Sequence, residues 1–233
     1  SGVIALTKCD IADEEWVGLV AAEVRELTCG SFLEHAPIVR TSSKTGAGLD
    51  ELRVALQAAA AAAAERISDR DFQAPFRMAI DRVFTMPGHV TVVTGSVSSG
   101  RSTVGAQLQL QPGHVDVRVR GLQTHDQSAD EIHRGQRAAI NLVGIHHQRL
   151  LRGQELASPG HLRTSRTLTV ELSLLPTAPR PLKNRRTVRL HVGTAEILAR
   201  VSLLGHDRLA PGEQGFAQLF LRADAATVSP PSS

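Results

Sequence analysis

Two short polar segments near the start of the chain contain the residue types that can recognise a guanine base. They are Thr7-Lys8-Cys9-Asp10 and Ser42-Ser43-Lys44. The carboxylate of Asp10 can accept hydrogen bonds from both the ring N–H and the exocyclic amine of guanine, and adenine offers no such pair of donors. The stem of Lys8 can cover the base plane, while a backbone N–H near Ser43 can donate to the guanine carbonyl oxygen. We therefore interpret the two segments as a guanine-binding site.

The elements around these segments predict how they are brought together. Each segment directly follows a short apolar run, at 3–6 and 37–39, which we interpret as strands. An amphipathic helix with Asp13 as its N-cap lies between them, and a second helix runs through the alanines at 58–64. Alternating strands and helices predict an α/β array in residues 1–66, in which ligands bind beyond the carboxyl ends of the strands.

The remainder of the chain has the pattern of β-structure. After a polar linker at 67–71, residues 72–160 contain apolar and polar residues in alternation, which predicts a β-barrel. Its first hairpin, 76–95, contains Asp81 and Arg82, and a later strand contains Arg137. Residues 161–233 resume the alternation and predict a second β-domain.

Bulk composition limits the partners that are plausible. The chain has 233 residues, a net charge of +3 and a sequence pI of about 9.4, a balance that tolerates an RNA partner without proving one. The two cysteines, Cys9 and Cys29, have no metal-binding spacing, so we predict no metal site and a reducing compartment. No apolar run is long enough to span a bilayer. We expect a cytoplasmic protein without a membrane partner.

Several segments resemble translational GTPases. The two guanine segments resemble their fourth and fifth G motifs, and Ile80-Asp81-Arg82-Val83-Phe84 with Thr91-Val92-Val93-Thr94-Gly95 resembles the opening of their domain II. Residues 135–142 resemble a late strand of the same domain. Thr7, the pair Asp81-Arg82 and the run 178–204 are similar to the selenocysteine-specific elongation factors, known in bacteria as SelB. The resemblance covers nearly all of the chain.

The resemblance implies a fold of three parts. Residues 1–66 correspond to the C-terminal part of a P-loop-type α/β G domain, 72–160 to β-barrel domain II, and 161–233 to an incomplete β-barrel domain III. It also implies that the intact protein binds GTP with Mg²⁺, binds selenocysteyl-tRNA, and delivers that tRNA to the ribosome. A selenocysteine insertion element in mRNA is an implied partner, through domains not found in these residues.

By the same resemblance, Asp81, Arg82 and Arg137 line a selenocysteine pocket. A selenol is far more acidic than a hydroxyl, so selenocysteine esterified to tRNA is an anion at neutral pH. Two arginines can supply cationic donors to it, and Asp81 can orient an arginine and the aminoacyl amine. The alternative is that these are ordinary surface charges on a barrel.

Some expected features are missing from the sequence. No Gly-x-x-x-x-Gly-Lys-Ser/Thr motif occurs, so we assign no catalytic residue and expect this chain alone to be inactive toward GTP. We expect it to be a piece of a longer protein. Val90 stands where the family has a second glycine in the hairpin turn. Two alternatives stay open: a general aminoacyl-tRNA elongation factor, and a nucleotide-independent, RNA-binding β-barrel module.

Overall fold

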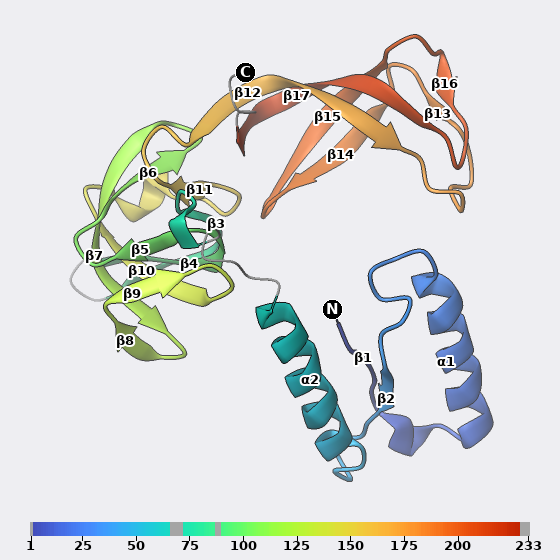
Figure 1. The fold of residues 1–233 in the computed structure, drawn as a ribbon. Coiled ribbons are helices and arrows are strands. Elements are labelled where there is room, and N and C mark those ends of the chain that lie inside the picture. The colour runs from blue at the N-terminus through green and yellow to red at the C-terminus, as the bar shows by residue number, and fades with distance from the viewer. Residues whose placement is uncertain (1, 66–71, 87–89, 229–233) are drawn as a thin grey trace. The chain divides into compact units, whose positions relative to one another are not determined.

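The computed structural model describes residues 2–65, 72–86 and 90–228 of the chain. The chain divides into two compact units, Ser1–Asp69 and Arg70–Ser233 (Figure 1). The predicted linker at 67–71 and residues 87–89 of the predicted hairpin lie outside the described residues, as do residues 229–233.

The first unit is a small α/β arrangement. Strand β1 (Ile4–Leu6) pairs in parallel with β2 (Ile38–Arg40), as the sequence predicts. Between them lie the one-turn helix η1 (Cys9–Ile11) and helix α1 (Glu14–Thr28), and after β2 comes α2 (Leu49–Ala64). The side chain of Asp13 caps α1 by accepting a hydrogen bond from the Trp16 N–H at 2.7 Å.

The apolar face of α1 is less covered than its sequence predicts. Val17 is buried, as are Ala36 and Val39, but Leu27, whose spacing places it on the same face of the helix as Val17, is 84% exposed. Helical periodicity tells which residues share a face but not what covers that face.

The second unit begins with a closed β-barrel, which confirms the predicted architecture. Its strands are β3 (Arg77–Met86), β4 (Val90–Ser99), β6 (Gln107–Gln111), β7 (Val115–Thr124), β10 (Arg137–Val143) and β11 (Glu155–Ala157). They follow the order β10-β4-β3-β11-β6-β7, and pairing of β7 with β10 closes the ring. The short strand β8 (Gln127–Ala129) pairs with β7, and β5 (Arg101–Thr103) pairs with β9 (Glu131–His133), while helix η2 (His147–Arg149) lies between β10 and β11 in the sequence.

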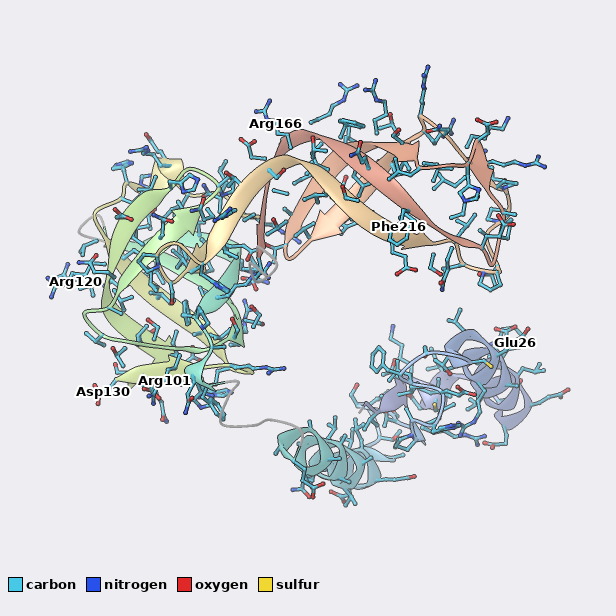
Figure 2. All side chains as sticks on the ribbon, turned by 45° about the horizontal axis from the view of Figure 1, so that its top comes forward. Glu26, Arg101, Arg120, Asp130, Arg166 and Phe216 are labelled. Carbon is cyan, nitrogen blue, oxygen red and sulfur yellow. The ribbon has the colours of Figure 1, made fainter. Side chains whose placement is uncertain are left out.

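Alternation of apolar and charged residues builds the barrel wall. On β7, Val117 and Val119 are buried in a core shared with Met78 and Ile80 of β3. The intervening arginines of β7 are exposed, and Arg120 projects from the outer surface in Figure 2. Closing the sheet on itself pairs the strand edges that an open sheet would leave exposed.

The unit continues into an open antiparallel sheet with a core of its own. Its strands, in spatial order, are β12 (Leu162–Ser173), β17 (Gln214–Val228), β15 (Ala195–Leu203) and β14 (Thr187–Val192). A smaller ladder pairs β13 (Leu182–Lys183) with β16 (Arg208–Leu209). In Figure 1, the long strands β12 and β17 run side by side. Within the described residues β12 and β14 do not pair with each other, so this sheet is not closed.

His191 on β14 lies beside Glu196, and 67% of its side chain is exposed. Among the helices in the described part of the chain, none is long and apolar enough to cross a membrane.

Candidate functional site

The parallel pair of strands brings the two predicted guanine-binding segments together. Both segments leave the same edge of the sheet, because β1 and β2 run in the same direction. The Cys9 N–H donates to the Thr41 carbonyl at 3.1 Å, which ties the two loops through their backbones. The Ser42 hydroxyl then donates to Oδ1 of Asp10 at 2.6 Å.

Ser42 and Asp10 have different roles in this arrangement. Ser42 is buried and also accepts a hydrogen bond from the Thr45 N–H at 3.2 Å, so its hydroxyl is fixed in place. Asp10 is exposed, and its carboxylate keeps lone pairs for an incoming donor. The remaining predicted members of the site are exposed around this pair: Thr7, Lys8, Ser43 and Lys44. Lys8 adopts a left-handed backbone (φ 61°), which turns the chain sharply from β1 into η1.

On the barrel, a β-bulge sets the direction of Asp81 and Arg82. The register of β3 against β4 pairs Ile80 with Gly95 and Arg82 with Thr94, so Asp81 has no opposite residue. Ile80 is fully buried, and Val83 packs against the same core. A regular strand would place Asp81 and Arg82 on opposite faces, but the extra residue lets both point outward.

The predicted pair Asp81 and Arg137 is in direct contact. Arg137 donates from Nη1 to Oδ2 of Asp81 and from Nη2 to Oδ1 at 3.0 Å, a two-pronged arrangement. Thr94 lies between them: its hydroxyl donates to Oδ1 of Asp81 at 2.8 Å and accepts from Arg137 Nη2 at 3.4 Å. The hydrogen bonds from Arg137 hold the pKa of Asp81 below its usual range, despite partial burial, which opposes them.

Arg82 remains available to an outside partner. Its side chain is exposed. Among the residues that the structure describes, it makes no hydrogen bond or ion pair. Its charge nevertheless contributes to the lowered pKa of Asp81. The site thus carries one carboxylate and two guanidinium groups, and one guanidinium is not engaged by the carboxylate.

A hollow of about 310 Å³ lies next to this cluster on the outer face of the barrel. The residues Ala139 and Asn141 continue the face of β10 that begins at Arg137, because every second residue of a strand points the same way. Oδ1 of Asn141 is buried without a hydrogen-bond partner among the described residues. The hollow is lined by Val92, Gly121, Leu122, Gln123, Ser128, Ala139 and Asn141.

Sequence reasoning missed Thr94 and Asn141. Thr94 reads as an ordinary β-branched strand residue, and only the register of three strands places it between Asp81 and Arg137. Asn141 offered a weak signal, since a buried amide in an apolar strand demands a partner. Among the described residues, no group of three or more His, Cys, Asp or Glu side chains is placed to hold a metal ion.

The fold of the chain is that of translation elongation factors. The apo elongation factor SelB of Methanococcus maripaludis superposes with a TM-score of 0.79 over 97% of this chain and 52% of its own, at 22% identity. A bacterial selenocysteine-specific elongation factor, EF-Sec, gives a TM-score of 0.75 over 97% of this chain and 36% of its own, at 24% identity.

Sequence comparison makes the assignment more specific. The chain is 43% identical over 220 residues to the selenocysteine-specific elongation factor of Desulfomicrobium baculatum, covering 94% of this chain and 34% of that protein. It is 32% identical to the Escherichia coli factor of the same name, and 31% identical to elongation factor Tu 2 of Streptomyces avermitilis over 86% of this chain and 54% of that protein. No protein-family model matches. The chain is homologous to the selenocysteine-specific elongation factors and spans about a third of their length.

Proposed function

We propose that this chain is the part of a selenocysteine-specific elongation factor that reads the aminoacyl end of selenocysteyl-tRNA. The observation that carries the proposal is the cluster of Asp81, Arg137 and the unengaged Arg82 on one bulge of the barrel. An ionised selenolate is attracted to guanidinium donors, whereas a neutral serine hydroxyl gains little from the same charges. Asp81 orients Arg137 through two of its N–H donors and leaves Arg82 unengaged, so both guanidinium groups keep donors for the anion.

The adjoining hollow supports the same proposal. An aminoacyl-tRNA ends in an adenosine whose ribose carries the amino acid, so a site for the amino acid needs a site for a base beside it. The hollow is open, mostly apolar in lining, and contains the unpaired Oδ1 of Asn141, which can accept a hydrogen bond from an exocyclic amine. Base and amino acid would then lie along neighbouring positions of β4 and β10.

The first unit would contribute guanine recognition. The Asp10 carboxylate, steadied by Ser42, has free lone pairs for the two donors of guanine, and exposed Lys8 can cover the base. The sequence holds no phosphate-loop motif, so we assign no ligands for the phosphates or for Mg²⁺ and derive no step through the metal. For the whole protein, we propose that it binds GTP, delivers the tRNA to the ribosome and is located in the cytoplasm. We also propose that it recognises the selenocysteine insertion element of mRNA.

Binding selectivity tests this function. We would replace the matching segment of the Desulfomicrobium baculatum factor with residues 1–233 and measure dissociation constants for selenocysteyl-tRNA and seryl-tRNA under reducing conditions at fixed salt. The proposal expects selenocysteyl-tRNA to bind at least about tenfold more tightly, because one charge-assisted hydrogen bond is worth about 1.5–3 kcal/mol. A general elongation factor would bind both alike, and a nucleotide-independent RNA module would show no dependence on GTP.

A further inference from the structure

The backbone of Ile80, the residue before Asp81, is held by two different parts of the second unit. Its N–H donates to the Gln154 carbonyl at 2.8 Å, and its carbonyl accepts from the Gly153 N–H at 3.1 Å. The same carbonyl also accepts from the Thr194 hydroxyl at 2.6 Å. A carbonyl has two lone pairs, so both donors can be accommodated at once. Thr194 lies in the turn between β14 and β15 of the open sheet, so that sheet contacts the backbone of the bulge directly.

Two glycines allow this close approach. Gly193 in the turn has φ +56°, and a Cβ there would lie 3.2 Å from both the Ala79 Cβ and Glu155 Oε1. Gly153 has φ +96°, and a Cβ there would lie 3.1 Å from the Ala195 Cα. Gly193 of the open sheet therefore faces the barrel, and Gly153 faces the open sheet. A larger side chain at either position would push the barrel and the open sheet apart.

A buried ion pair holds the surface on which the turn rests. The side chain of Glu155 is only 2% exposed and accepts from Arg77 Nε at 2.5 Å and from Arg77 Nη2 at 2.9 Å. Arg77 and Glu155 sit on the paired strands β3 and β11, so the pair resists relative sliding of these strands. The surface that meets Gly193 is thus fixed from within the barrel.

We propose that Thr194 is a positioning residue, whose hydroxyl fixes the peptide unit between Ile80 and Asp81 and thereby aims the Asp81 carboxylate at Arg137. The carbonyl of Ile80 and the N–H of Asp81 belong to one planar unit, so holding the carbonyl limits rotation at the bulge. The open sheet then influences which amino acid the barrel selects. The importance of this contact for tRNA rests on the proposed function, but the contact itself can be tested without tRNA.

The first experiment measures the pKa of Asp81 in the 233-residue chain by carboxyl-carbon NMR. Arg137 and, more weakly, Thr94 and Arg82 lower this pKa, so it reports how well the carboxylate is aimed. Thr194→Val, which removes the hydroxyl and keeps the shape, should raise the pKa of Asp81 by about half a pH unit, equivalent to about 0.7 kcal/mol. Thr194→Ser should leave it near the wild-type value, as should Thr169→Val at an exposed position of β12.

An unchanged pKa in folded Thr194→Val would overturn the proposal. A second route to the same geometry is Gly193→Ala, which keeps the hydroxyl but pushes the turn away from Ala79 and Glu155, and it should raise the pKa of Asp81 as well. If Thr194→Val and Gly193→Ala both failed to fold while Thr194→Ser and Thr169→Val folded, the contact would be a requirement for folding. That result would also overturn a positioning role.

The second experiment tests whether the hydrogen bond from Thr194 to Ile80 affects the choice between selenocysteyl-tRNA and seryl-tRNA. In the chimeric factor, Thr194→Val should reduce the preference for selenocysteyl-tRNA over seryl-tRNA about twofold to threefold, the change that half a pH unit represents. Thr194→Ser should retain the preference. If the wild-type chimera showed no preference, the proposed function would fail, and the pKa result would still decide the role of Thr194.

Discussion

Arg137 binds both oxygens of the Asp81 carboxylate across 56 positions of sequence, and Thr94 fills the space between the two side chains. The contact exists because β4 lies between β3 and β10 in the barrel and because the bulge turns Asp81 outward. A carboxylate held in this way has a lowered pKa, which gives it a measurable effect on stability.

We expect Asp81→Asn to lower stability at neutral pH and to have less effect in acid. Because the folded protein lowers the pKa of Asp81, the stabilisation is present above the unfolded value near 3.9 and is lost as the pH falls through the folded value. The loss should be no more than about 1 kcal/mol, since the pair is partly exposed to solvent. Urea midpoints at several pH values test this, with Asp130→Asn as control. An equal loss at every pH would contradict it.

The buried pair of Arg77 and Glu155 should contribute more to the stability of the folded protein than the pair of Asp81 and Arg137. Removing one partner of a fully buried pair costs about 3–5 kcal/mol. Because the Arg77 side chain is 25% exposed, we expect Glu155→Gln to cost about 2–3 kcal/mol in urea denaturation. The matched control is Glu131→Gln, which removes an exposed partner of Arg101 and should cost less than about 1 kcal/mol. Similar losses in the two variants would show that burial of Glu155 does not matter.

Hydrogen exchange should be slowest in the barrel. Its core contains fully buried Met78, Ile80, Leu110, Ile132, Ile140 and Leu156, whereas within residues 2–65 the buried apolar residues are Val17, Ala36 and Val39. Amides open locally at a rate that depends on how much packing must be broken. Mass spectrometry or NMR on the 233-residue chain can rank the segments. Finding the most protected amides within residues 2–65 would refute this expectation.

GTP should bind the 233-residue chain weakly. The Asp10–Ser42 site can give base specificity, but most affinity for a nucleoside triphosphate comes from contacts to phosphate and Mg²⁺. We expect a dissociation constant above about 1 µM by calorimetry. Any residual preference for guanosine over adenosine should disappear in Asp10→Ala and persist in Glu23→Ala, an exposed position on α1. Submicromolar binding would contradict the expectation.

The sequence predicted elements better than contacts. Asp13, the apolar runs at 3–6 and 37–39 and the alternation on β7 each have a local physical signal, and the structure contains the elements they predict. The contact between Asp81 and Arg137 has no local signal, since it depends on the order and register of three strands. One clue was present: alternation on β3 breaks after Ile80, so that Val83 and not Arg82 returns to the core, which is the signature of the bulge.

The central claim is that Arg137 and Arg82 read a selenolate. In the chimeric factor, Arg137→Ala and Arg82→Ala should each weaken binding of selenocysteyl-tRNA by roughly one to two decades and change seryl-tRNA binding little. The controls are Arg120→Ala and Arg189→Ala, exposed arginines that do not belong to the cluster, which should lower both affinities together and alter their salt dependence. The deciding measurement is the ratio of the two dissociation constants for Arg137→Ala at fixed salt. A ratio near one supports the claim, and a ratio equal to that of the unsubstituted protein contradicts it.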